Sequence, residues 1–324
     1  MRGPDRPALT AGPGARPMRL SPALVLRMTR PGFLSITAVA ALVGIASAWS
    51  IGCRPVPTTM IATIALAVLA HAAANVINDY HDALNGADDA NDAGIWPFTG
   101  GSRLIQTQTT TVALTGCVAA GLFALVAVAG LAIALRHEPL LLPIGAAGLL
   151  LGWGYSAPPL RLMSRGLGEL AVAIAWSLIL VGSAASACRQ AVPPALACAP
   201  GFGLMLANIL LINEFPDARA DAAVGKATLV VRLGARPAAR LYLALAVLAH
   251  LLAGLMVLLG ALPWQALAAW IALPIATLAA RALIRDHAAP ARLRAPIVAT
   301  IAAAHLYGIG LALGLSFAGP GGLH

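Results

Sequence analysis

Charged residues are scarce in this sequence. Only 10% of its 324 residues are Asp, Glu, Lys or Arg, whereas 60% are hydrophobic, and the mean hydropathy is +0.84. This balance excludes an ordinary soluble domain and is typical of a polytopic membrane protein. The scarcity also gives weight to each charge that is present, because a charged side chain is costly in a bilayer unless it binds something.

Cysteine is rare as well. The four cysteines lack the spacing of metal ligands. Cys53 and Cys188 fall in or near outer loops and could pair, although unpaired thiols are the favoured interpretation.

Residues 1–30 contain no apolar core of a cleaved signal peptide. We expect instead a disordered basic tail that leads into a short interfacial helix around residues 21–30, with an Arg-rich transit peptide as the alternative.

Long apolar runs dominate the rest of the chain. Those long enough to cross the hydrocarbon core lie at 33–50, 58–78, 109–135, 139–155, 167–187, 193–213, 238–260, 263–284 and 295–317. The sequence therefore predicts an all-α membrane protein with about nine transmembrane helices, in which residues 31–318 form one domain.

The formal net charge of +9 could indicate a nucleic-acid partner, but the positions of the charges argue against it. With a cytoplasmic N-terminus, only Arg54, Arg136 and Arg189 of the 21 basic residues fall in outer segments. This asymmetry follows the positive-inside rule. It predicts a multi-pass protein of the bacterial inner membrane with its N-terminus in the cytoplasm. The partner that this pattern indicates is the lipid bilayer and not a nucleic acid.

Most of the twelve acidic residues gather at the cytoplasmic ends of two apolar runs. Helical spacing places the members of each cluster on one polar face. The first cluster contains Asn75, Asn78, Asp79 and Asp82, followed by Asp88, and the second contains Asn213, Asp217 and Asp221. Amide and carboxylate oxygens without Cys or His suit Mg²⁺ that accompanies a phosphorylated ligand. Solvated helix ends with Asx caps are the alternative, and two clusters on one side of the membrane favour the metal site.

Three basic residues lie in predicted inner segments, on the same side of the membrane as these clusters. Arg103 follows Gly100, Gly101 and Ser102, in a long loop typical of a lid, and small residues beside an arginine suit anion binding. Arg161 follows a Pro pair that holds it near the membrane surface. Lys226 is the single lysine, and its ammonium suits contact with phosphate. The alternative for the segment that ends in Arg103 is an ordinary turn, and the alternative for Arg161 is an inner-loop arginine that only sets the membrane topology.

At these residues the chain resembles the UbiA superfamily of intramembrane prenyltransferases, from about residue 30 to 316. The branch it resembles most is the 1,4-dihydroxy-2-naphthoate polyprenyltransferases. The similar segments are Asn78-Asp79-Tyr80-x-Asp82-x-x-x-Gly86-x-Asp88, Asp217-x-x-x-Asp221-x-x-x-Gly225-Lys226-x-Thr228-Leu229-x-Val231-Arg232-Leu233-Gly234, Gly100-Gly101-Ser102-Arg103 and Tyr155-Ser156-Ala157-Pro158-Pro159. The sequence departs from the superfamily where Gly86 replaces a common aspartate, Glu214-Phe215-Pro216 replaces a polar run, and Arg161 replaces a common lysine.

The resemblance implies helices around a central cavity and Mg²⁺-dependent transfer of a prenyl group from a polyprenyl diphosphate to an aromatic acceptor. Catalysis would rest on Asp79, Asp82, Asp217 and Asp221, and the diphosphate would contact Arg103, Arg161, Lys226 and Arg232. The favoured acceptor is 1,4-dihydroxy-2-naphthoate of menaquinone synthesis, and 4-hydroxybenzoate, homogentisate, chlorophyllide and haem are the alternatives. An ion-coupled transporter is disfavoured, because the acids lie at the ends of spans and no inverted repeat is evident.

Overall fold

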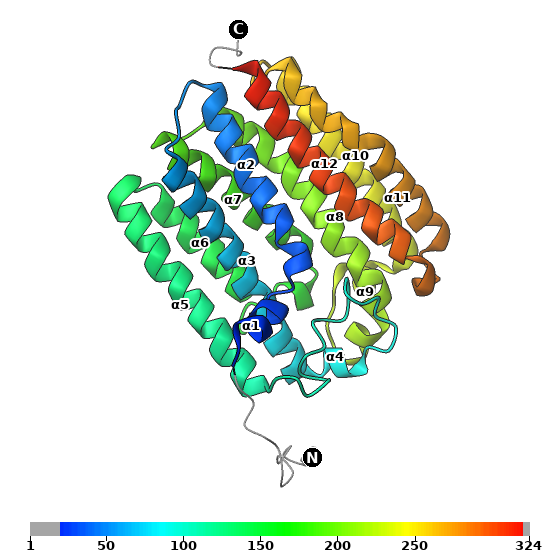
Figure 1. Ribbon diagram of the computed structural model, residues 1–324. Coiled ribbons are helices and arrows are strands. Elements are labelled where there is room, and N and C mark those ends of the chain that lie inside the picture. The colour runs from blue at the N-terminus through cyan, green and yellow to red at the C-terminus, as the bar shows by residue number, and fades with distance from the viewer. Residues whose placement is uncertain (1–19, 320–324) are drawn as a thin grey trace.

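The computed structural model describes residues 20–319, and all of the regular structure in this range is helical. Eight helical stretches of the described chain are long and apolar enough to cross a membrane (Figure 1). They are α2 (Ser35–Ser50, extended by η1, Pro31–Phe33), α3 (Pro57–Asn85), α5 (Val112–His137), α7 (Gly168–Cys188), α8 (Pro193–Ala223), α10 (Ala235–Leu258), η3 (Trp264–Ala272) continued by α11 (Leu273–Asp286), and α12 (Arg294–Ala318). The shorter elements are α1 (Pro22–Met28), α4 (Ala87–Ala90), α6 (Leu141–Gly154), η2 (Met163–Arg165), α9 (Leu229–Leu233) and η4 (Pro290–Arg292).

The fourth predicted span is shorter than a full crossing. Its helix, α6, has 14 residues, which at 1.5 Å per residue is roughly 21 Å against a hydrocarbon core of about 30 Å. The predicted all-α membrane fold is confirmed. Of the nine expected membrane helices, eight are full-length stretches in the described chain and the ninth is the short helix α6. The expected helix near residue 21 is α1, where the Ser21 hydroxyl accepts a hydrogen bond from the Leu24 amide at 3.2 Å. The expected basic tail falls largely on residues 1–19, outside the described residues.

Close helix contacts hold the bundle together. Helix α7 packs against α2 and α8, and α12 packs against α2, α8 and η3. Small residues allow the helix backbones to approach one another. Gly44 of α2 is an example, since a Cβ atom at this position would collide with the Leu180 carbonyl of α7. Buried polar side chains find backbone partners: the Tyr307 hydroxyl donates to the Ala249 carbonyl at 2.9 Å.

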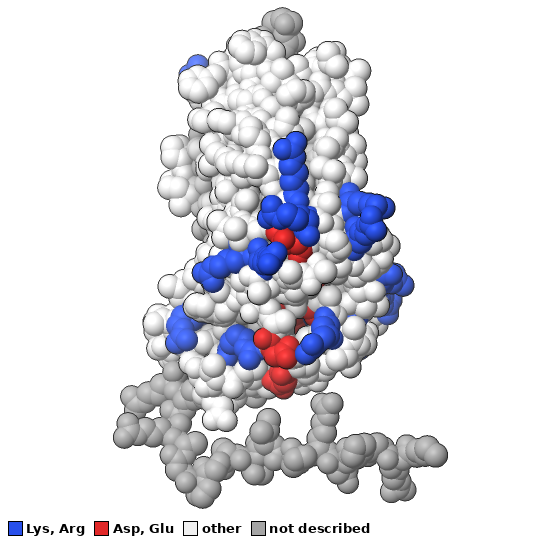
Figure 2. Space-filling model, turned by 90° about the vertical axis from the view of Figure 1, so that its right-hand side faces the viewer, with Lys and Arg blue, Asp and Glu red and all other residues white. Residues whose placement is uncertain are grey.

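The two ends of the bundle differ in charge. Helices α1, α4 and α9 lie at one end, and α12 finishes at the other (Figure 1). Figure 2 shows that most Lys and Arg side chains on the α11 face lie toward the α4 and α9 end. The exposed arginines of α11, η4 and the start of α12 are Arg281, Arg285, Arg292 and Arg294. This end of the molecule is the one for which the sequence predicts a cytoplasmic position.

A disulfide joins the helices at the opposite end. Cys53, between α2 and α3, is bonded to Cys188 at the end of α7, and their Cα atoms are 5.4 Å apart. The expectation of unpaired thiols was therefore wrong. Because 135 residues separate the two cysteines, their proximity depends on the packing of α2 against α7, which composition and spacing do not reveal.

Candidate active site

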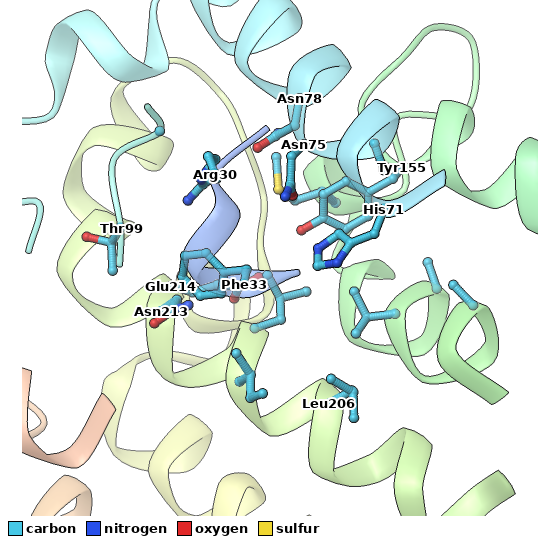
Figure 3. Close-up of a pocket in the computed structure, with 18 of the residues that line it drawn as sticks. Arg30, Phe33, His71, Asn75, Asn78, Thr99, Tyr155, Leu206, Asn213 and Glu214 are labelled. Atoms are coloured by element: carbon cyan, nitrogen blue, oxygen red, sulfur yellow. The ribbon is translucent and has the colours of Figure 1, made fainter. Parts of the chain in front are cut away.

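Both acidic clusters meet in one cavity at the end of the bundle that carries α4 and α9. The cavity has a volume of about 260 Å³. Helix α3 contributes Asn75, Asn78 and Asp82, and α8 contributes Asn213, Asp217 and Asp221. Each set shares a helix face because its members are spaced three or four residues apart. Figure 3 shows Asn75, Asn78, Asn213 and Glu214 around this space. The predicted convergence of the two clusters is thus present in the fold.

The segment between α4 and α5 closes over the clusters and contacts both. The Asn91 side-chain amide and the Gly100 backbone amide donate to Asp217, at 2.7 and 3.1 Å. The Ser102 amide donates to Asp79 at 3.2 Å. The glycines near Arg103 were expected to offer amides to a bound anion. In the structure two backbone amides of this segment hold carboxylates of the protein instead.

The Gly100–Gly101 pair is required by this path of the chain. Both glycines have left-handed backbones, with φ of 77° and 72°, a conformation that other residues rarely adopt. A Cβ atom at Gly101 would also collide with the carboxyl of Asp88. Burial raises the pKa of Asp88 to about 8, and the charges of Asp82 and Asp79 act in the same direction.

Lys226 connects the two clusters. Its Nζ lies 3.0 Å from Oδ1 of Asp82 on α3 and 3.1 Å from Oδ1 of Asp221 on α8. The Lys226 side chain is only 7% exposed. Burial alone would lower the pKa of Lys226, but the two carboxylates outweigh that effect and raise it above its ordinary value. The ammonium therefore stays charged and offsets the repulsion between the clusters.

The other three predicted diphosphate ligands do not line the cavity. Arg103 donates to the backbone carbonyls of Asp88 and Asn91, at 2.8 and 3.1 Å, and so shapes the closing segment. Arg232 donates to the Arg165 carbonyl at 2.8 Å. Arg161 has a left-handed backbone, with φ of 44°, on the turn after α6. The guanidinium groups of Arg103 and Arg232 are held by carbonyls, which sequence spacing could not show.

Sequence reasoning missed Arg30, which lines the cavity (Figure 3). Its Nη1 lies 3.9 Å from Oδ1 of Asp79, and its guanidinium lies over the Phe33 ring, 5.4 Å from the centroid. The Nε atom is buried without a hydrogen-bond partner. A lone arginine directly before the first span was assigned to topology, and no motif marked it as part of a site.

The inner part of the cavity is apolar with a few polar groups. His71 shares a 2.7 Å hydrogen bond with the Thr37 hydroxyl and meets the Trp176 ring edge-on. Tyr155, Leu206 and Glu214 complete the wall in Figure 3. The site thus has a polar mouth with carboxylates and two cations, and an apolar interior that can exclude water.

The donor atoms at the mouth suit a hard divalent cation. They are carboxylate and amide oxygens, and Oδ1 of Asn213 is buried without a partner. Within residues 20–319, however, no three Asp, Glu, His or Cys side chains lie close enough to share one metal ion. Protein donors contact all four carboxylates in this structure: loop amides donate to Asp79 and Asp217, and the Lys226 ammonium lies between Asp82 and Asp221.

Comparison with known proteins identifies the family. Residues 36–305 match the UbiA prenyltransferase family. The chain belongs to this family. It is 31% identical over 208 residues to the 1,4-dihydroxy-2-naphthoate octaprenyltransferase of Mycobacterium leprae, across 64% of this chain and 67% of the relative. It is 32% identical over 202 residues to the enzyme of the same name from Mycobacterium tuberculosis, across 62% and 66%. The matches thus span about two thirds of these relatives.

The fold agrees with the UbiA family. A UbiA homologue from Archaeoglobus fulgidus, bound to DMAPP and Mg²⁺, superposes with a TM-score of 0.59 at 17% identity, covering 89% of this chain and 99% of that one. This similarity establishes the architecture. The protein is therefore a multi-pass membrane prenyltransferase of the UbiA family, as its sequence motifs indicated.

Proposed function

We propose that this protein transfers a polyprenyl group from polyprenyl diphosphate to 1,4-dihydroxy-2-naphthoate, a step of menaquinone synthesis, with Mg²⁺ as cofactor. The observation that carries the proposal is the meeting of both acidic clusters and Lys226 at the mouth of one apolar cavity. The named activity of the two mycobacterial relatives supports the acceptor. The Mg²⁺ bound by the archaeal homologue together with DMAPP supports the cofactor.

In this proposal Asp79, Asp82, Asp217 and Asp221 hold Mg²⁺, with Asp88 and the amides of Asn75, Asn78 and Asn213 beside them. Bound Mg²⁺ would offset the charge that grows on the leaving diphosphate. Lys226 supplies a further positive charge between the clusters, and Arg30 supplies one beside Asp79. The arginines Arg103, Arg161 and Arg232 take a secondary role, since none of them lines the cavity.

The reaction breaks the bond between the first prenyl carbon and the diphosphate oxygen, and forms a bond between that carbon and a ring carbon. The bond between the ring and its carboxylate also breaks, and the carboxylate leaves as carbon dioxide, so the products are prenylated 1,4-dihydroxynaphthalene, diphosphate and carbon dioxide. When the carbon–oxygen bond breaks, positive charge develops on the allylic group. That charge needs protection from water, and the apolar walls around His71, Trp176 and Leu206 provide it.

Acceptor preference tests this proposal. Purified protein with Mg²⁺ and octaprenyl diphosphate is offered 1,4-dihydroxy-2-naphthoate, 4-hydroxybenzoate and homogentisate in competition, and products are separated by mass. The naphthoate product should dominate, with one carbon dioxide released per prenyl group transferred. Preference for 4-hydroxybenzoate or homogentisate would leave the family activity intact and overturn the acceptor assignment.

We also propose that the end with α4 and α9 faces the cytoplasm of a bacterial inner membrane. The charge asymmetry supports this orientation. The Cys53–Cys188 disulfide supports it as well, because disulfides persist on the oxidising side of the membrane and this one lies at the opposite end.

Thiol labelling tests the orientation. We expect Ala261→Cys, between α10 and η3, to react with a membrane-impermeant maleimide in intact cells. Ala288→Cys, between α11 and η4, should react only after the cells are opened. The reverse pattern would overturn the orientation and place the acidic cavity on the wrong side for a cytoplasmic substrate.

A further inference from the structure

Two nitrogen donors lie in the otherwise apolar inner part of the cavity. His71 is on α3 and Trp176 is on α7, and both side chains line the cavity. Their rings meet edge to face, with centroids 4.8 Å apart and an interplanar angle of 80°. The indole Nε1 of Trp176 is buried and has no hydrogen-bond partner in the described chain. Because a buried N–H group without a partner is costly, this donor indicates that a ligand supplies the missing oxygen.

The contact between His71 and Thr37 determines which nitrogen of the neutral imidazole carries the proton. Nδ1 of His71 lies 2.7 Å from the hydroxyl of Thr37, which is fully buried on α2. If Nδ1 carried the proton, the O–H of Thr37 would have no acceptor within the described chain. The hydroxyl is therefore the donor, Nδ1 is the acceptor, and the ring proton lies on Nε2.

The Nε2–H group of His71 is thus a second donor to the cavity. It makes no hydrogen bond to any residue between 20 and 319, and Figure 3 shows the His71 ring among the side chains around the cavity. The hydrogen bond from Thr37 fixes the orientation of this ring, and the contact with Trp176 holds the two donors next to each other. The pair is therefore preorganised to bind an oxygen atom.

The depth of these donors limits which substrate can supply that oxygen. His71 precedes Asp79 by eight residues on α3, which is roughly 12 Å at 1.5 Å per residue. The diphosphate is proposed to lie at the carboxylates, so its oxygens do not extend this far into the cavity. The prenyl group is a hydrocarbon and has no atom that accepts a hydrogen bond. Among the proposed substrates, only the aromatic acceptor can carry an oxygen into the inner cavity.

We propose that Nε2 of His71 and Nε1 of Trp176 both donate to one hydroxyl oxygen on the ring of the aromatic acceptor, and so determine its orientation and part of its specificity. This inference rests on the proposed prenyl transfer. In 1,4-dihydroxy-2-naphthoate the oxygen is that of the 4-hydroxyl, because the carbon that receives the prenyl group must face the mouth of the cavity. A hydroxyl oxygen has two lone pairs and can accept both hydrogen bonds.

The test compares 1,4-dihydroxy-2-naphthoate with 1-hydroxy-2-naphthoate, which lacks the 4-hydroxyl. Isothermal titration under anaerobic conditions gives Kd for each compound with the full-length protein in lipid nanodiscs, without turnover. The wild type should bind the dihydroxy compound at least about tenfold more tightly, since each hydrogen bond contributes about threefold to tenfold. His71→Leu and Trp176→Phe should each lower this preference by about threefold to tenfold, because each removes one N–H donor.

Two further variants separate loss of a donor from loss of packing. His71→Gln keeps an N–H donor near the position of Nε2 and should retain more of the preference than His71→Leu. Trp153→Phe on α6 is the matched control, because this tryptophan does not line the cavity, and it should leave both Kd values unchanged. In initial-rate measurements His71→Leu and Trp176→Phe should raise KM for the acceptor, while KM for the prenyl diphosphate stays within about twofold of the wild type.

An equal loss of affinity for both compounds in His71→Leu and Trp176→Phe would overturn the inference and show that the two side chains only form an apolar wall. A raised KM for the prenyl diphosphate with unchanged acceptor binding would also overturn it. A wild type that transfers no prenyl group to the naphthoate would refute the proposed function. The Kd comparison needs no turnover, so it would still decide whether the two donors bind a ring hydroxyl.

Discussion

Asp82→Asn and Asp221→Asn should each abolish most turnover while leaving the protein folded. Asparagine keeps the size of the side chain but removes the charge that is proposed to hold Mg²⁺ at the diphosphate. Loss of a single group that stabilises developing charge typically lowers kcat by about 10²- to 10³-fold. The measurement is the initial rate of prenyl transfer at saturating Mg²⁺, with thermal unfolding of the same samples as the check on folding.

Asp92→Asn is the matched control for these variants. The Asp92 side chain is 74% exposed and pairs with exposed Arg219 at 3.2 Å, an interaction that contributes little to stability. Its rate should stay within about twofold of the wild type, as for most exposed substitutions. Rates near wild type in both Asp82→Asn and Asp221→Asn would exclude the two clusters from the reaction.

Lys226→Ala should weaken use of the prenyl diphosphate by tens-fold, with little change in the KM for the acceptor. A charge-assisted hydrogen bond to phosphate contributes about 1.5–3 kcal/mol, which corresponds to this loss. In the structure the ammonium contacts Asp82 and Asp221, so it reaches the position at which the diphosphate is proposed to lie. The measurement is kcat/KM for each substrate separately.

The thermal stability of the same variant distinguishes a role of Lys226 in diphosphate binding from a purely structural role. Removal of the lysine leaves two carboxylates close together, so thermal stability should fall as well. Lys226→Arg keeps the charge and should restore much of both properties. If Lys226→Ala is less stable but shows an unchanged KM and kcat for the prenyl diphosphate, Lys226 only ties α3 to α8.

Much of the fold could be predicted from the sequence, because membrane spans depend on local composition. Apolar runs predicted the eight membrane-length stretches of the described chain and the short helix α6, although they gave α6 as a full crossing. The pairing of Cys53 with Cys188 could not be predicted, since it depends on which helices are neighbours. Helix packing in membranes relies on small residues such as Gly44, and these are too common in this chain to specify partners.

The candidate site could also be predicted only in part from the sequence. Spacing along one helix placed Asn75, Asn78 and Asp82 on a shared face, and this prediction needed only helical geometry. The partners of the cations needed tertiary structure. Arg103 contacts carbonyls of its own loop, whereas Arg30, which no motif marked, enters the cavity. The sequence could show where charges are concentrated, but not which of them meet.

The measurement that tests the central claim most directly is the Mg²⁺ dependence of prenyl transfer by the wild-type protein. Purified enzyme in nanodiscs is supplied with octaprenyl diphosphate and 1,4-dihydroxy-2-naphthoate, and product is quantified with Mg²⁺, in excess chelator, and after Mg²⁺ is restored. We expect product with Mg²⁺, none above background in chelator, and full recovery on restoration. Product formed at an undiminished rate in excess chelator would contradict metal-assisted transfer at the two acidic clusters.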